Sequence, residues 1–184
     1  YLAAYKLFEQ AAENGEEEAY YDLGMMNYYG EGVPKNREAA LDWFNKSANA
    51  GNAKAVAMIG TIYFEDDSIK DYDHVLSIFT KAAAEGDLTA EFYLGRMYVQ
   101  GLGVEQNYAT GLAWFKKAAH PLHAAGMTGY HHLSINAMLN VRRIYAEGLL
   151  GEEDPKAAEP WYEKACYLDS QKACELWEEI KLKI

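Results

Sequence analysis

The chain is poor in the features that identify membrane proteins and nucleic-acid-binding proteins. None of its apolar runs approaches the length that spans a bilayer. Lysine and arginine number 17 against 28 aspartates and glutamates, so the net charge is -11 and phosphate groups are repelled. We therefore expect neither membrane insertion nor nucleic-acid binding. The acidic side chains are expected to form a solvated outer surface.

Motifs of the common catalytic machineries are also absent. The sequence has no phosphate-binding loop, dinucleotide fingerprint, Gly-x-Ser-x-Gly elbow or His-Glu-x-x-His motif. The Gly-x-Gly-Val turns at 30–33 and 101–104 follow predicted helices rather than strands, and we interpret them as helix terminators. We predict a protein without enzymatic activity and without a cofactor.

Two segments carry residues that metal ions favour, and neither has the spacing of a known site. Residues 65–73 are rich in carboxylates, but they lack the glycine and glutamate that a calcium-binding EF-hand loop needs. Capping of the next helix by Asp71 or Asp73 explains them better. Imidazole is a common zinc ligand, and four histidines lie in or beside a predicted insertion: His120, His123, His131 and His132. Without added cysteines or suitably spaced carboxylates, we expect ordinary loop histidines.

The chain does contain one pattern that is repeated along its length. An aromatic or aliphatic pair recurs at Leu7-Phe8, Trp43-Phe44, Ile78-Phe79, Trp114-Phe115 and Trp161-Tyr162. Successive pairs are 36, 35, 36 and 47 residues apart. A small residue follows each pair, at Ala19, Ala55, Ala90, Ala137 and Ala173. Because these landmarks move together, we infer a helical repeat protein.

Each repeat is predicted to form two helices. In the best-matched repeat, four residues fall on one helical face: Ala90, Leu94, Met97 and Tyr98. N-caps of second helices are expected at Asn36, Asn107 and Asp154. Glycines recur in the middle of the first helices, at Gly24, Gly60 and Gly95. Glycine there costs about 1 kcal/mol against alanine, so we infer that a neighbouring helix crosses closely at these positions.

Two irregularities interrupt the pattern in the C-terminal half. In the earlier repeats, the last alanine of a second helix is seven residues before the alanine that opens the next first helix. The corresponding alanines here, Ala119 and Ala137, are eighteen residues apart. We interpret the eleven added residues as a bulged loop with one helical turn after Pro121, so the next first helix is expected to open at Ala137. Farther on, Pro160 predicts either a second helix that begins only there or a bent helix.

The landmarks resemble those of the Sel-like repeat (SLR) family, a branch of the tetratricopeptide superfamily. The resemblance rests on Ala90, Leu94-Gly95, Tyr98, Gly101, Gly103-Val104 and the run from Ala113 to Ala119, and on the equivalent run from Ala19 to Ala48. It implies an all-α, right-handed superhelix of about ten helices that forms a single solenoid over residues 1–184. The expected units are a partial one at 1–15, then 16–51, 52–86, 87–136 with an insertion at 120–134, 137–169, and a partial one at 170–184. Because the chain opens inside a second-helix pattern without a starting Met, we expect a fragment or a processed form.

The resemblance implies a non-enzymatic scaffold or adaptor that binds a protein or peptide on its concave face. In helical-pair solenoids the first helices line that face. First-helix positions that differ between repeats are free to contact a partner, and several carry side chains of the types enriched at interfaces. The predicted partner-binding residues are Tyr21, Met25, Phe92, Tyr93, Arg96 and Arg143. For any one of them, contact with a neighbouring helix is an equally good explanation.

The two cysteines, Cys166 and Cys174, lie eight residues apart across a predicted helix-to-helix turn. They resemble those of the cysteine-rich secreted branch of the SLR family, in which such cysteines bridge paired helices. A bridge would imply an oxidising, extracytoplasmic compartment, whereas two buried thiols would suit a cytosolic protein. That branch has been linked to β-lactams and peptidoglycan-like ligands, but Ser-x-x-Lys, Ser-Asp-Asn and Lys-Thr-Gly are absent here. The alternative function is a metal-dependent or cell-wall-directed hydrolase that uses the histidine-rich insertion.

Overall fold

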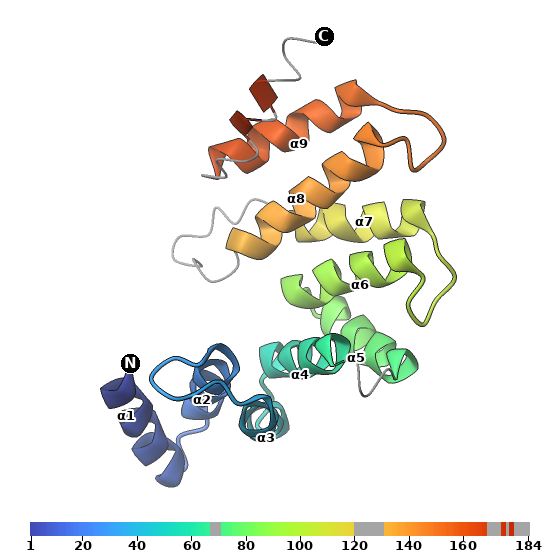
Figure 1. Cartoon of the computed structure of the whole chain (residues 1–184). Coiled ribbons are helices and arrows are strands. Elements are labelled where there is room, and N and C mark those ends of the chain that lie inside the picture. Colours follow the sequence, from blue (N-terminus) through green and yellow to red (C-terminus); the bar gives the residue numbers. More distant parts are fainter. Residues whose placement is uncertain (67–70, 120–130, 169–173, 176, 179–184) are drawn as a thin grey trace. The chain divides into compact units, whose positions relative to one another are not determined.

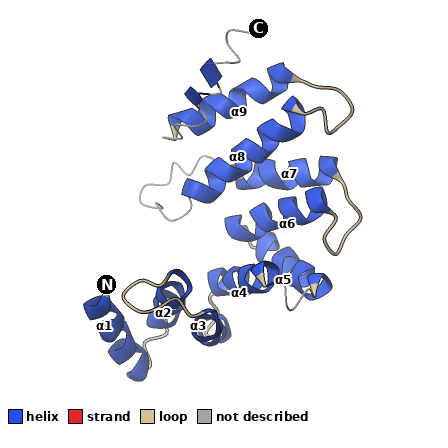
Figure 2. Cartoon of the chain, viewed as in Figure 1, coloured by secondary structure: helices blue, strands red, loops and turns tan. Residues whose placement is uncertain are grey.

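The protein is built from α-helices in the part of the chain that the computed structural model describes (Figure 1). That part comprises residues 1–66, 71–119, 131–168, 174, 175, 177 and 178. Nine helices are present there, and no strand occurs among these residues (Figure 2). The helices are α1 (Leu2–Glu13), α2 (Glu18–Tyr29), α3 (Arg37–Asn49), α4 (Ala53–Glu65), α5 (Tyr72–Ala84), α6 (Leu88–Gln100), α7 (Tyr108–Ala118), α8 (His131–Ala146) and α9 (Pro155–Tyr167). The all-α prediction of about ten helices is confirmed.

The chain divides into two compact units, residues 1–87 and residues 88–184. In the first unit each helix packs against the next one, from α1 to α5. In the second unit α6, α7, α8 and α9 pack in the same consecutive way, and α6 also contacts α8. Within each unit, helices that are neighbours in sequence therefore cover one another's apolar faces, as repeat modules do. The continuity of one solenoid over the full chain stays a prediction.

The mid-helix glycines mark the closest approach between paired helices. A Cβ atom added to any of them would lie only 2.6 or 2.7 Å from an aromatic ring of the following helix. The pairs are Gly24 with Phe44, Gly60 with Phe79, and Gly95 with Phe115. All three rings are fully buried. The inferred close crossing is confirmed, because a side chain larger than hydrogen would push the ring out of the core.

Glycines in the left-handed conformation follow the first helices of the two best-matched repeats. Gly30 is the C-cap of α2 with φ of 81°, and its N–H donates to the Met26 carbonyl. Gly101, directly after α6, has φ of 69°. Only glycine adopts such φ values at little cost, so these residues end the helices and turn the chain.

Asparagine and aspartate side chains begin the second helices, as predicted. The side-chain oxygens of Asn36, Asn107 and Asp154 each accept a hydrogen bond from the backbone N–H three residues later, at 2.9 to 3.1 Å. The backbone N–H of each cap donates to a carbonyl of the preceding first helix, at 2.8 or 2.9 Å. Those acceptors are Asn27, Tyr98 and Tyr145. The cap therefore orders the turn on one side and the new helix on the other.

In the second repeat, the turn lacks glycine and residues 67–70 lie outside the described part of the chain. Asp71 is the N-cap of α5, and its Oδ1 accepts a hydrogen bond from the backbone N–H of His74 at 3.0 Å. Asp73 lies in the first turn of α5, where a carboxylate interacts favourably with the helix dipole. The capping role expected for one of these aspartates belongs to Asp71.

The fourth repeat begins earlier than expected. The inserted residues 120–130 lie outside the described residues, so the predicted bulge and helical turn are not described. However, α8 already begins at His131, and the expected opening at Ala137 is wrong. Ser134 is only 1% exposed, so the helix is already packed against its neighbours at that point. Packing, rather than the repeat alanine, determines this helix start.

The second helix of that repeat runs through its internal proline. α9 extends from Pro155 past Pro160 to Tyr167, so the helix does not begin at Pro160. Pro155 occupies the first turn, where a missing N–H costs nothing, and Asp154 caps the same end. Because α9 packs on α8, tertiary contacts offset the backbone hydrogen bond that Pro160 cannot make.

Lysine–tryptophan pairs recur on the second helices. In each pair the lysine lies three residues after the tryptophan, so both side chains share one helical face. The lysine Nζ lies 3.9 to 4.6 Å from the centroid of the indole ring. The pairs are Trp43–Lys46, Trp114–Lys117 and Trp161–Lys164. Such cation–π contacts stabilise exposed sites by about 0.5–1 kcal/mol each.

Candidate functional site

A cavity of about 540 Å³ opens in the second unit among α6, α7 and α8. This volume lies within the range of about 300–1,000 Å³ that is typical of ligand pockets. Its apolar lining comes from Phe92, Val99, Phe115, Leu139 and Leu149. Its neutral polar lining comes from Gln100, Gln106, Tyr108, Asn136 and Asn140. The cavity thus combines an apolar surface with amide groups that donate and accept hydrogen bonds.

Three of the four arginines in the chain line this cavity: Arg96, Arg142 and Arg143. The fourth, Arg37, lies in the first unit and pairs with Glu65 at 3.2 Å. No lysine, aspartate or glutamate is among the described residues that line the cavity. In a chain of net charge -11, the cavity is therefore a local concentration of positive charge.

The helix α6 contributes an aromatic ring and a guanidinium group from one face. Phe92 is 7% exposed, and its ring centroid lies 5.7 Å from that of Phe115 on α7. Arg96 follows one turn later, so the helical period places both residues on the same side. The Cζ atom of Arg96 lies 5.4 Å from the centroid of the Tyr93 ring. The aromatic neighbour holds the guanidinium plane beside the cavity through a cation–π contact.

Arg142 occupies the position at which the other first helices have their mid-helix glycine. Its Cζ atom lies 4.9 Å from the centroid of the Tyr162 ring on α9. The aromatic residue that packs on glycine in the earlier repeats here packs under an arginine. The Nε atom of Arg142 is buried and has no hydrogen-bond partner among the described residues. A buried N–H group in that state favours an added acceptor.

Arg143 lies beside it on α8 and is more open to solvent. Its side chain is 57% exposed and forms an ion pair with Glu147, one helical turn later, at 3.0 Å. On the opposite side, Gln106 donates from Nε2 to the Val99 carbonyl at 2.8 Å. It also donates to the Tyr108 hydroxyl at 3.1 Å. These bonds tie the loop between α6 and α7 to the end of α6 and so fix this wall of the cavity.

The structure brings together three of the six predicted partner-binding residues. Phe92, Arg96 and Arg143 all line the cavity. Tyr93 does not line it; its ring is buried, as that of Phe92 is, but lies outside the cavity. Sequence comparison among repeats missed Arg142, although the replacement of a repeat glycine by arginine was a visible signal.

The other two predicted residues lie in the first unit. Tyr21 and Met25 are half-buried and pack against the core cluster that contains Phe44 and Met58. The Tyr21 ring centroid lies 5.7 Å from that of Phe44. These two side chains therefore cover a neighbouring helix and still keep part of their surface exposed. Next to them, partial burial raises the pKa of Asp22 above its ordinary value.

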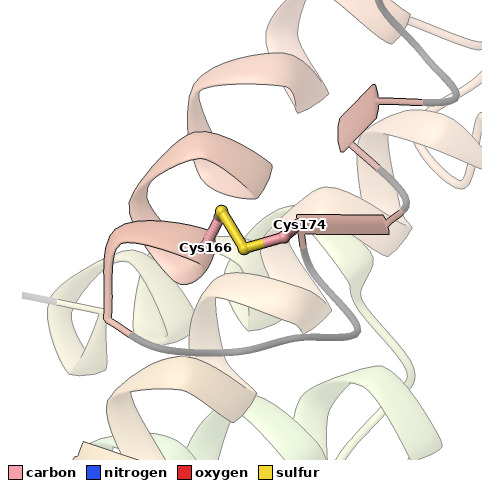
Figure 3. The surroundings of a disulfide bond; sticks show 2 residues. All are labelled: Cys166 and Cys174. Atoms are coloured by element: carbon pink, nitrogen blue, oxygen red, sulfur yellow. A yellow bond between two sulfur atoms is a disulfide. The ribbon is translucent and has the colours of Figure 1, made fainter.

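The two cysteines form a disulfide bond in the structure (Figure 3). Cys166 lies in the last turns of α9, and its Sγ atom is bonded to that of Cys174 at 2.02 Å. The bond connects α9 to a segment of which only residues 174, 175, 177 and 178 are described. The compartment that such a bridge would imply stays a prediction.

The described residues contain no group of three histidine, cysteine, aspartate or glutamate side chains that could hold a metal ion. Of the four histidines in or beside the insertion, His120 and His123 lie outside the described residues, and His132 is exposed. Within the same part of the chain, every helix is too short or too polar to cross a membrane.

Paired helices, glycine crossings and capped turns define an α-helical repeat protein with a cavity beside its first helices. The model of the Sel1 repeat family matches residues 1–16, 17–52, 88–120 and 136–170. The chain therefore belongs to the Sel1 repeat family, which is the SLR branch of the tetratricopeptide-like superfamily. The matches leave out residues 53–87, whose turn has lost its glycines, yet α4 and α5 pack as the same kind of helix pair.

Curated relatives share the repeat over part of their length. DAP3-binding cell death enhancer 1 of Rattus norvegicus is 24% identical over 157 residues, which cover 65% of this chain and 31% of that protein. The ERAD-associated E3 ubiquitin-protein ligase component HRD3 of Candida glabrata is 31% identical over 109 residues, which cover 55% of this chain and 13% of that protein. The chain thus spans about a third or less of these relatives.

Solved structures share the same architecture. One is a protective antigen of uropathogenic Escherichia coli strains that displays an SLR fold. It is 32% identical with a TM-score of 0.78, over 98% of this chain and 37% of that chain. Another is a Sel1 repeat protein from Oxalobacter formigenes, 24% identical with a TM-score of 0.72, over 94% of this chain and 66% of that chain. The second likeness concerns the fold alone.

Proposed function

We propose that this protein is a non-enzymatic scaffold that binds a protein or peptide segment on its first-helix face, centred on the cavity of the second unit. Sel1 repeat proteins are typically scaffolds for protein–protein interaction. The observation that carries the proposal for this chain is the make-up of the cavity. It gathers repeat-equivalent positions from two first helices, Phe92 with Leu139 and Arg96 with Arg143.

Packing between repeats does not require one residue type at the positions of Phe92 and Arg96. At the equivalent positions of the first unit stand Tyr21 with Met25 and Ala57 with Thr61, and none is an arginine. A position that tolerates such different residues is available for a partner, whereas the glycine and phenylalanine positions are not. Arginine and aromatic residues are also the types that most often dominate binding energy at protein interfaces.

The first unit carries candidate contact residues of its own. Tyr21 and Met25 keep part of their side chains exposed and would contact a partner that reaches the first unit. Tyr93 would act indirectly, because its buried ring supports the Arg96 guanidinium. Two relatives carry names that describe assembly with other proteins, "DAP3-binding" in one and an E3 ligase component in the other. These names support a binding role without identifying a partner for this chain.

The test is capture of partners by the wild-type chain and by the double variant Arg96→Glu and Arg143→Glu, quantified by mass spectrometry. These two arginines are a cleaner perturbation than Phe92, because truncation of a buried phenylalanine would also destabilise the unit. The matched control is Lys6→Glu with Lys81→Glu, which makes the same change in net charge at exposed sites that do not line the cavity.

We expect a partner that the wild type and the control retain and that the cavity variant retains at least about tenfold less, since loss of one charged hydrogen bond exceeds 1.4 kcal/mol. Circular dichroism of all three proteins would verify that the helices are intact. Equal retention by all three proteins would contradict the proposal.

A further inference from the structure

We infer that the cavity of the second unit recognises an acidic side chain, Asp or Glu, within the partner segment, together with an apolar side chain of the same segment. This inference rests on the proposed function and adds the chemistry of the ligand. It follows from the arginines, the buried Nε atom of Arg142, the apolar lining and the placement of the amides.

The cavity is lined by positive charges, although the chain as a whole is negatively charged. The protein carries -11 overall, yet Arg96, Arg142 and Arg143 line one cavity of about 540 Å³. The cations in question are all arginines, although the chain contains more lysines than arginines. The planar guanidinium fork pairs with a carboxylate through two parallel hydrogen bonds, which an ammonium group cannot do.

Arg142 is already held for such a contact. The Tyr162 ring lies under its guanidinium group, with the centroid 4.9 Å from Cζ, so the side chain has little freedom left to lose on binding. Its Nε is buried without a hydrogen-bond partner among the described residues. A ligand oxygen at this site would supply the acceptor that the protein itself does not.

The amount of positive charge suits one carboxylate rather than a polyanion. Glu147 already pairs with Arg143 at 3.0 Å and offsets one of the three charges. The acidic surface of the chain would repel a long polyphosphate or a nucleic acid. A single Asp or Glu brings one negative charge and leaves the rest of the ligand neutral.

The apolar lining calls for a second contact beside the carboxylate. Val99, Leu139 and Leu149 are half-buried and line the cavity, beside the buried Phe92 ring. An apolar side chain next to the acidic one would displace water from these surfaces, at a gain of about 25 cal/mol per Å² buried. The expected ligand is therefore a short segment with neighbouring acidic and apolar residues.

Amide side chains flank the arginines along both first helices. Gln100 follows Arg96 by one turn on α6, and Asn136 precedes the arginines of α8 by about two turns. Side-chain amides both donate and accept, so they suit the backbone of an extended peptide. Because they lie on both sides of the arginines, the backbone is expected to continue past the acidic residue in both directions. This arrangement favours an internal Asp or Glu over a chain-terminal carboxylate.

The test begins with selection of a random-peptide phage library on the full chain, in parallel with the Arg96→Glu and Arg143→Glu double variant. Peptides enriched by the wild type alone are expected to share an acidic residue beside an apolar one. The best peptide is then synthesised in three forms: as selected, with its acidic residue changed to the corresponding amide, and with an amidated C-terminus. Affinities are measured by fluorescence anisotropy.

The amide form should bind at least about tenfold more weakly, and the C-terminally amidated form should bind as the original does. On the protein, Arg142→Lys keeps the charge but removes the Nε–H donor. It should abolish most of the preference for the acidic peptide over its amide form. The Lys6→Glu control should leave that preference unchanged.

Each contrary result has a distinct meaning. Selected peptides that bind equally well as acid and amide would overturn the inference, while their loss in the cavity double variant would keep the proposed function. Sensitivity to C-terminal amidation alone would identify a terminal carboxylate and overturn the assignment to an internal side chain. A selection that enriches no peptide contradicts the inference, and the partner-capture experiment then decides the proposed function by itself.

Discussion

Gly95→Ala is a direct test of the close helix crossing, because two well-known effects oppose each other at this residue. Helix propensity favours alanine over glycine by about 1 kcal/mol in the middle of a helix. The added Cβ would lie 2.7 Å from two atoms of the Phe115 ring and 3.0 Å from a third. Phe115 is 1% exposed, so the ring cannot move aside without disturbing the core.

The size of the effect follows from these two terms. Overpacking in a core costs about 1–3 kcal/mol, and the contact of three ring atoms places Gly95→Ala toward the upper end. After subtraction of the propensity gain, the net destabilisation is expected to be about 1–2 kcal/mol. With a urea dependence of about 2 kcal/mol per M, the unfolding midpoint should fall by roughly 0.5–1 M.

The assay is urea unfolding followed by circular dichroism. Ala113→Gly, at an exposed position of α7, makes the reverse exchange and measures the propensity term alone. The double variant Gly95→Ala with Phe115→Leu should be less destabilised than the sum of the two single changes, because the smaller side chain leaves room for the methyl group. A Gly95→Ala protein as stable as the wild type, or more stable, would refute the close crossing.

Three further predictions concern a cap, a carboxyl group and the disulfide. Asn107→Ala should lower the stability by about 1 kcal/mol, because the Thr110 N–H loses its acceptor. Asn107→Asp should retain most of the stability, and thermal unfolding of both variants measures the difference. The raised pKa of Asp22 means that the carboxyl group binds its proton more tightly in the native protein than in the unfolded chain. Protonated Asp22 therefore stabilises the fold at low pH, and this stabilisation is lost as the pH rises past the native pKa. Asp22→Asn should therefore be more stable than the wild type at pH 7 and lose that advantage below about pH 4, which unfolding at both pH values would show. Reduction of the Cys166–Cys174 bond should lower stability by about 2–3 kcal/mol, as expected for a short closed loop; unchanged unfolding with and without reductant would contradict a stabilising role.

Much of the fold followed from the sequence because its signals are local. Gly24 and Gly95 recur at one position of the repeat, and Asn36 and Asn107 recur at another. Each reports a backbone requirement that hardly depends on distant contacts: a close approach or a helix cap. Repetition multiplied these weak signals, so the all-α architecture and its family were both predictable.

Helix boundaries in the fourth repeat were less predictable. The sequence offered Ala137 as an opening residue and Pro160 as a break, and both indications are local. In the structure the helix starts at His131 and α9 continues through Pro160. Burial of Ser134 and the packing of α9 on α8 decide these ends, and neither contact has a sequence signal of its own.

The candidate site was also predictable only in part from the sequence. Comparison of repeats singled out Phe92, Arg96 and Arg143 as first-helix positions that differ between repeats, because side-chain periodicity defines which residues share a helical face. It could not tell that Tyr93 lies outside the cavity, nor that Arg142 is held on the Tyr162 ring at the edge of the same cavity. Which neighbour covers a given face depends on how helices far apart in sequence pack together. The sequence by itself therefore determined the helices, their caps and their crossings, whereas tertiary packing alone decided which side chains meet around an open space.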